Sequence, residues 1–101
     1  MAQRKVVWTD TAKSQRRAIF DYWNNRNQSK TYSEKLRKHI QLRIVQLVQH
    51  PNSGKETTFS NTKITSLGHF SLVYRTTQEQ IIVFGFWDTR QDPDKLLKSL
   101  T

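Results

Sequence analysis

Apolar residues recur at helical spacing most regularly between residues 31 and 50. Most of them are three or four positions apart, and together they form a stripe of about five turns: Tyr32, Leu36, Ile40, Ile44, Leu47 and Val48. Basic residues such as Arg37 and Lys38 fall on other sides of the same segment. Pro51 should end the helix near His50, because the residue before a proline avoids the α region. The pattern predicts a long amphipathic helix with one face in the core.

A short strand and another helix are predicted ahead of this segment. The stretch RKVVW at Arg4–Trp8 is an apolar run bounded by polar residues, as in a strand. Thr9 and Asp10 can cap the helix that follows. Its apolar residues recur at helical spacing: Ala12, Ile19, Tyr22 and Trp23. The run NNRNQS, from Asn24 to Ser29, should break this helix, because asparagine competes for backbone hydrogen bonds. Two antiparallel basic helices are therefore expected before His50.

After a turn at PNSGK the hydrophobic period changes to two. Between residues 70 and 75 two sets of side chains alternate, as in a strand with one buried face: Phe70, Leu72 and Tyr74 toward the core, and Ser71, Val73 and Arg75 on the other face. Residues 81–87 are apolar on both faces, as in a strand covered on both sides, and the polar TTQEQ joins the two strands. One or two weaker strands are expected within residues 55–66. Asp92 and Pro93 can begin a short terminal helix.

The order of these elements predicts an α+β fold formed by a single domain over residues 1–101. An N-terminal strand and a helical hairpin pack on a mostly antiparallel sheet of three to four further strands, followed by a short C-terminal helix. The exposed face of the sheet is where a ligand could lie.

The distribution of charge along the chain indicates what kind of partner the protein binds. The chain carries 17 Lys and Arg against 8 Asp and Glu, a net charge of +9. Residues 1–50 hold 11 basic and 3 acidic side chains, so the surplus of eight lies in the helical half. This favours a polyanionic partner: nucleic acid, an acidic protein or an anionic membrane. A solubilising surface is the simpler alternative.

Several classes of site and location are disfavoured by the sequence. The absence of cysteine excludes disulfides and thiolate metal sites, and three histidines without paired spacing do not predict a metal site. No cofactor is expected. No apolar run is long enough to span a bilayer and no signal-peptide core is present. We therefore expect a small cytoplasmic protein that does not enter a membrane.

Four segments in this order resemble the RelE/ParE superfamily of bacterial toxins from type II toxin–antitoxin pairs. VVWTDTAKSQRRAIFDYW resembles the opening strand and first helix, and YSEKLRKHIQLRIVQLVQHPNSG the second helix and its turn. GHFSLVYRT and IIVFGFWDTRQDP resemble the two central strands, and one branch of the superfamily has a similar DTRQ-P ending. The resemblance covers about residues 5–97.

The resemblance implies a growth-arresting toxin that is silenced by an acidic antitoxin. RelE-type members cleave messenger RNA on the ribosome, whereas ParE-type members inhibit DNA gyrase. The fold is shared, so the target must be argued from the site. Ribosome-dependent RNA cleavage leads gyrase inhibition only narrowly. Binding to ribosomal RNA would suit the basic helices, whose charges can neutralise phosphates, whereas the long helical hairpin looks more like the ParE type. A non-enzymatic protein–protein inhibitor and an unrelated nucleic-acid-binding domain are further alternatives.

RNA cleavage of this kind requires cations to stabilise the phosphorane and groups that move protons, and it needs no metal. The candidate catalytic residues are Arg75, Arg90, His69 and Lys55. The candidate substrate-binding residues are Lys63, Ser71, Asp88 and Trp87, with Glu56 as a further titratable group. RelE-type toxins usually have an arginine where this chain has Ser71. They also have a terminal tyrosine or histidine where it has Leu96 and Leu97. Both departures favour gyrase or a weakened nuclease.

Each candidate also has a purely structural interpretation. Arg75 could pair with Glu79 or Asp88 across the hairpin, and Asp88 with Arg90 could form a local pair that ends the buried strand. Three aromatic residues are expected in the core: Trp8, Trp23 and Phe59. Trp87 fits either the core or a groove. His69 is the histidine closest to the proposed groove, whereas His39 and His50 are expected to be structural.

Overall fold

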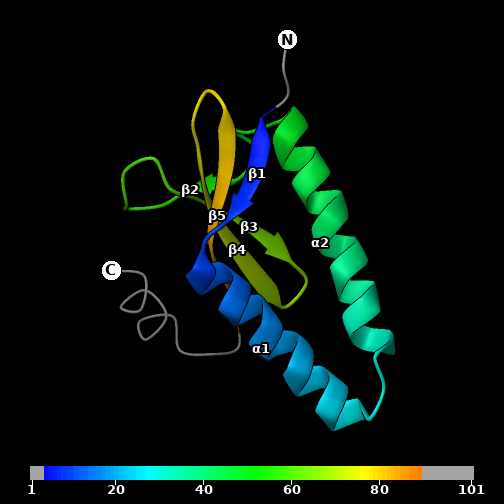
Figure 1. Ribbon diagram of the computed structural model, residues 1–101. Helices are drawn as coiled ribbons and strands as arrows, with labels where there is room; N and C mark the ends of the chain where they lie inside the picture. The colour runs from blue at the N-terminus through cyan, green and yellow to red at the C-terminus, as the bar shows by residue number, and fades with distance from the viewer. Residues whose placement is uncertain (1–3, 90–101) are drawn as a thin grey trace.

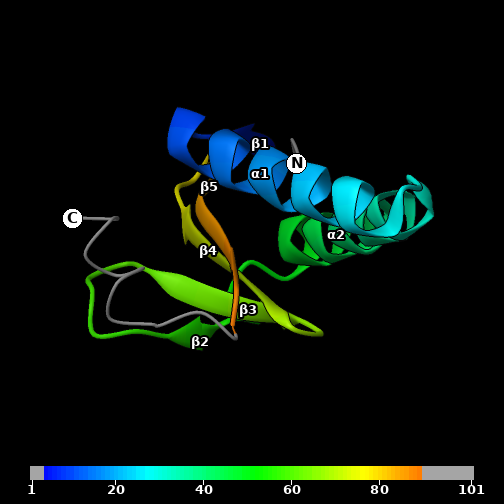
Figure 2. The same ribbon diagram turned by 90° about the horizontal axis from the view of Figure 1, so that it is seen from below.

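The computed structural model describes residues 4–89, so the expectations for Arg90, Asp92, Pro93 and the terminal helix lie outside the described residues. Seven elements follow one another along the chain: β1 (Lys5–Trp8), α1 (Asp10–Asn27), α2 (Thr31–Gln49), β2 (Lys55–Glu56), β3 (Lys63–Leu67), β4 (Phe70–Thr76) and β5 (Gln80–Asp88). The sheet order is β1-β5-β4-β3-β2, and the β1–β5 pair alone is parallel. Both helices lie on the same side of the strands (Figures 1 and 2). The predicted α+β architecture is confirmed.

Both ends of α1 lie where the sequence predicted them. Thr9 caps the helix, because its side chain accepts a hydrogen bond from the Ala12 backbone N–H at 3.2 Å. As predicted, α1 ends within the run NNRNQS, at Asn27. Gln28 then takes the left-handed conformation at φ 50°, and its N–H donates to the Asn24 carbonyl. The Asn24 side chain accepts a hydrogen bond from Ser33 Oγ at 2.6 Å, so a contact with α2 outweighs the local preference of asparagine.

The core lies between the helical hairpin and the central strands. The predicted apolar stripe of α2 is confirmed, with Leu36, Ile40 and Leu47 buried. These side chains meet the inward faces of β4 and β5 in one cluster. The remaining members of that cluster are Ala12, Phe70, Leu72, Tyr74, Ile81, Val83 and Phe86. The core therefore fixes how the hairpin sits on the sheet.

The expected core aromatics are only partly confirmed. Trp8 and Trp23 are half-buried and pack against the core cluster. Tyr22 is 55% exposed, contacts the Trp23 ring edge-on and accepts a hydrogen bond from Arg26. Phe59 is 41% exposed, because it lies in the loop between β2 and β3, where its backbone N–H donates to Thr57. The expectation that Phe59 is a core residue was wrong.

A β-bulge and a side chain from α1 shape the middle of β5. Val73 pairs with Gly85 and Tyr74 with Val83, so Phe84 has no partner on β4. β1 ends opposite Val83, which leaves the rest of β5 without a strand on that side. Gln15 of α1 supplies an acceptor there, since its Oε1 accepts the Phe86 N–H at 2.9 Å. The bulge is thus held against the first helix.

The turn after α2 is anchored by one buried phenol. Tyr74 Oη donates to the Pro51 carbonyl at 2.9 Å and accepts the Gly54 N–H at 3.0 Å. Burial raises the pKa of Tyr74, although the hydrogen bond from Gly54 acts in the opposite direction. This contact joins the C-terminal end of the hairpin to the centre of the sheet.

Candidate functional site

Arg75 lies near the end of β4 and is exposed, as a ligand-binding cation must be. Its guanidinium carbon lies 5.0 Å from the centroid of the Phe84 ring, which is the bulged residue of β5. A guanidinium over an aromatic face gains from the ring quadrupole. The side chain is thereby given a defined position, with its charge still open to solvent.

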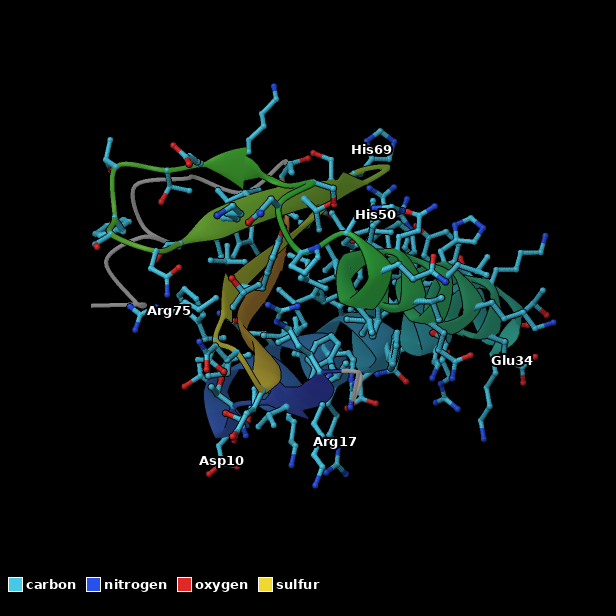
Figure 3. All side chains as sticks on the ribbon, turned by 90° about the horizontal axis from the view of Figure 1, so that it is seen from above. Asp10, Arg17, Glu34, His50, His69 and Arg75 are labelled. Carbon is cyan, nitrogen blue, oxygen red and sulfur yellow. The ribbon has the colours of Figure 1, made fainter. Side chains whose placement is uncertain are left out.

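His69 lies at the opposite end of the same strand. It is exposed in the turn between β3 and β4, and its carbonyl accepts hydrogen bonds from the Thr89 backbone N–H at 2.6 Å and the Thr89 hydroxyl at 2.8 Å. Six residues of extended chain separate His69 from Arg75, about 20 Å at the usual rise of a strand. Figure 3 shows the two side chains far apart. One phosphate cannot contact both of them.

The lysine candidates do not join Arg75 either. Lys55 is exposed on the two-residue strand β2 at the edge of the sheet. Lys63 of β3 pairs with Glu56 on one side and with Tyr74 on the other. Because directly opposed residues share a face and neighbours along a strand alternate, Lys63 lies on the face opposite Arg75. The four described candidate cations are thus distributed over separate parts of the sheet: Lys55, Lys63, His69 and Arg75.

The face that was expected to be open is closed at its centre. Ser71 pairs with Trp87 across the β4–β5 ladder, and each is 7% exposed. Val73 on the same face is 2% exposed. Asp88 is half-buried opposite Phe70. Trp87 is therefore a buried residue, and Ser71 cannot meet a bulky substrate without a local rearrangement.

A cleft that the sequence did not predict lies between the two helices. It has a volume of about 450 Å³ and is lined by Lys13, Arg16, Arg17, Phe20, Arg37, Ile40 and Gln41. We call it the basic cleft. Burial lowers the pKa of Arg16, and the nearby charge of Arg37 lowers it further. The sequence signal was the basic residues of each helix, but their convergence depends on how the helices cross.

Two further observations concern the described part of the chain as a whole. Neither α1 nor α2 is both long and apolar enough to cross a membrane. Across residues 4–89, histidine, aspartate and glutamate form no group of three or more that could hold a metal ion.

Comparison with known families gives a match over most of the chain. Residues 6–93 match the model of the ParE toxin of the type II toxin–antitoxin system parDE. A search of curated proteins found no match.

Three solved structures share the fold. A chain from the chromosomal ParDE system of P. aeruginosa has a TM-score of 0.72 and 19% identity, covering 85% of this chain and 96% of that one. A mutant of the E. coli toxin RelE, in complex with an antitoxin RelBc peptide, has a TM-score of 0.59 and 14% identity, covering 99% and 96%. A chain of the E. coli DinJ–YafQ toxin–antitoxin complex has a TM-score of 0.56 and 6% identity, covering 88% and 96%.

Proposed function

Because the chain belongs to the ParE toxin family of type II toxin–antitoxin systems, we propose that it arrests growth by binding and inhibiting DNA gyrase. The family match confirms the resemblance to the RelE/ParE superfamily and implies an antitoxin partner. In this proposal the toxin acts in the bacterial cytoplasm, by protein–protein contact, and catalyses no reaction.

The match of residues 6–93 to a ParE family model is the observation that carries the proposal. The arrangement of the candidate catalytic residues supports it. Among residues 4–89, His69 and Arg75 lie at opposite ends of β4, and Lys63 lies on the other face of the sheet from Arg75. A phosphoryl-transfer site needs its cations and its proton-transfer group around a single phosphate. Ser71 is also buried and carries no charge.

Ribosome-dependent RNA cleavage, which the sequence placed narrowly ahead, is the competing function. It would use Arg75 and the candidates outside the described residues, Arg90 above all, to stabilise charge on the phosphate. Loss of such a donor typically lowers the rate about a hundred- to a thousandfold. The nuclease hypothesis therefore requires Arg75→Ala and Arg90→Ala to relieve toxicity, and requires His69→Ala to do so if His69 moves a proton.

A paired assay with purified protein tests the proposed function. Supercoiling by gyrase should be inhibited in a dose-dependent manner, and Arg75→Ala and His69→Ala should inhibit as well as the wild type. Primer extension on a message translated in vitro should show no new cleavage product at the same doses. Message cleavage that Arg75→Ala abolishes, together with fully active gyrase, would refute gyrase inhibition and establish the nuclease.

We also propose that the antitoxin is acidic. Its charge would complement the helical half, where residues 1–50 carry 11 basic and 3 acidic side chains. A neighbouring small reading frame with an acidic C-terminal half, whose product neutralises toxicity when co-expressed, is the expected finding. A basic product that neutralises the toxin would contradict this proposal.

A further inference from the structure

The basic cleft lies in the angle between the two helices. α1 and α2 diverge from the loop at residues 28–30, as Figure 1 shows. Lys13, Arg16 and Arg17 reach it from α1, and Arg37 reaches it from α2. Its remaining lining residues are Phe20, Ile40 and Gln41, so none of the lining residues is acidic.

Aromatic rings hold two of these arginines in place. The Arg16 guanidinium lies 4.3 Å from the centroid of the Trp8 ring, and the Arg37 guanidinium lies 5.6 Å from that of Phe20. A guanidinium that is attracted to an aromatic face is restrained by the ring and keeps N–H groups available for an anion. An anion that binds there gains hydrogen bonds without ordering a mobile side chain first.

The cations of the cleft repel one another. Arg16 is partly buried, and both its burial and the charge of Arg37 act to lower its pKa. A bound anion would relieve this repulsion. Figure 3 shows Asp10 and Glu34 at opposite ends of the hairpin, with Arg17 between them and pointing away from the helix. The third acidic residue of the hairpin, Asp21, is exposed one turn after Arg17 on α1 and is not among the residues that line the cleft. The charge of the cleft is therefore displayed to solvent.

We propose that the basic cleft binds consecutive phosphates of duplex DNA, so that the toxin contacts DNA as well as protein at its target. The choice of duplex DNA rests on the proposed function, because gyrase acts on DNA. The chemistry of the cleft suits a nucleic-acid backbone. Four of its seven lining residues are cations and none is acidic, so several closely spaced phosphates can be neutralised together.

The geometry of the hairpin allows this contact beside a protein contact. The helices lie on one side of the molecule, while β2 and the β3–β4 turn lie on the other (Figure 2). DNA bound along the cleft would leave that second side free for a protein. Because the cleft offers cations and few groups that read bases, binding should be independent of sequence.

Titration of a fluorescein-labelled 20-base-pair duplex with the purified toxin, followed by anisotropy, tests this proposal. The association constant should fall as the salt concentration rises. The slope of log K against log salt should become shallower by about 0.9 for each phosphate contact that a variant removes. The double variant Arg16→Gln/Arg37→Gln should weaken binding about tenfold or more at low salt, and its slope should be shallower by about 1.8. Lys13→Gln/Arg17→Gln should have a similar effect without disturbing the contact of Arg16 with Trp8.

Lys35→Gln/Lys38→Gln is the matched control, because it removes the same charge from α2 at exposed positions outside the cleft lining. We expect it to weaken binding less than threefold. Equal losses in control and cleft variants would overturn the proposal in favour of a general field of positive charge. Binding of a glutamate-rich peptide, but not of the duplex, at the cleft would overturn it in favour of an acidic protein.

The same preparations keep this inference separate from the proposed function. A toxin that binds the duplex through the cleft but leaves gyrase supercoiling intact would refute gyrase inhibition and leave the DNA site standing. A toxin that inhibits gyrase, with the Arg16→Gln/Arg37→Gln variant as potent as the wild type and no affinity for the duplex, would refute the DNA site alone.

Discussion

Tyr74 and Gly54 show how one contact ties two distant parts of the chain together. A Cβ atom built on Gly54 would lie 2.5 Å from Tyr74 Oη and 3.0 Å from the Ile64 carbonyl oxygen. Gly54→Ala should therefore lower the free energy of unfolding by about 1–3 kcal/mol, the usual range for overpacking. In the Tyr74→Phe background the cost should be smaller, because the hydroxyl is gone. Urea unfolding of the four proteins gives the coupling, and strictly additive losses would show that the Tyr74 hydroxyl is not the obstacle; the ring carbon Cε1, 2.9 Å from the added Cβ, is present in both backgrounds.

Gln15 is a second residue whose role depends on a long-range contact. Its Oε1 accepts the N–H of Phe86, whose own side chain is fully buried. Gln15→Ala would leave that N–H without its acceptor, so we expect a loss of about 1–3 kcal/mol in unfolding free energy. Gln46→Ala, at an exposed position on α2, should change it by less than 0.5 kcal/mol. Equal effects in chemical denaturation would mean that the Phe86 N–H finds another acceptor.

At the scale of elements, α2 offers a direct comparison of its two faces. Ile40 is 4% exposed within the core cluster, whereas Leu42 on the same helix is 65% exposed. Ile40→Ala should cost about 2–5 kcal/mol, a large share of the stability of a domain this size. Leu42→Ala should leave unfolding within about 0.5 kcal/mol of the wild type. If Leu42→Ala shifted the urea midpoint as much as Ile40→Ala, the face of α2 that packs on the sheet would not be the one described here.

The period of the apolar residues was sufficient to predict which side chains are buried wherever the local pattern and the tertiary packing agree. The stripe of α2 and the inward set Phe70, Leu72 and Tyr74 were predicted because the core selects them by spacing alone. The run NNRNQS was correctly predicted to end α1, but the position of the end within it was not, since Asn24 accepts a hydrogen bond from Ser33 on the other helix. The bulge at Phe84 carries no local signal, because a register shift is a property of the strand pair.

The candidate site was harder to predict, because its residues belong to different elements. Arg75 was correctly expected to be exposed, yet its distance from His69 follows from the length of β4. Ser71 was placed on an open face from alternation alone, and Trp87 was left as either a core or a groove residue, because burial on that face is a tertiary property. The basic cleft joins Arg16 to Arg37 across the hairpin, and the angle between helices cannot be read from either helix alone.

For the whole molecule, the uneven charge predicts how the toxin meets its antitoxin. Residues 1–50 hold a surplus of eight positive charges, and the basic cleft concentrates four cations of the hairpin. Such a field attracts an acidic partner over several ångströms, and salt screens it beyond about 8–10 Å. We expect the association rate measured by stopped flow to fall at least about tenfold between low and high salt, while the dissociation rate changes little. Arg16→Gln/Arg37→Gln should reduce this salt dependence, and an association rate independent of salt would show that steering plays no part in neutralisation.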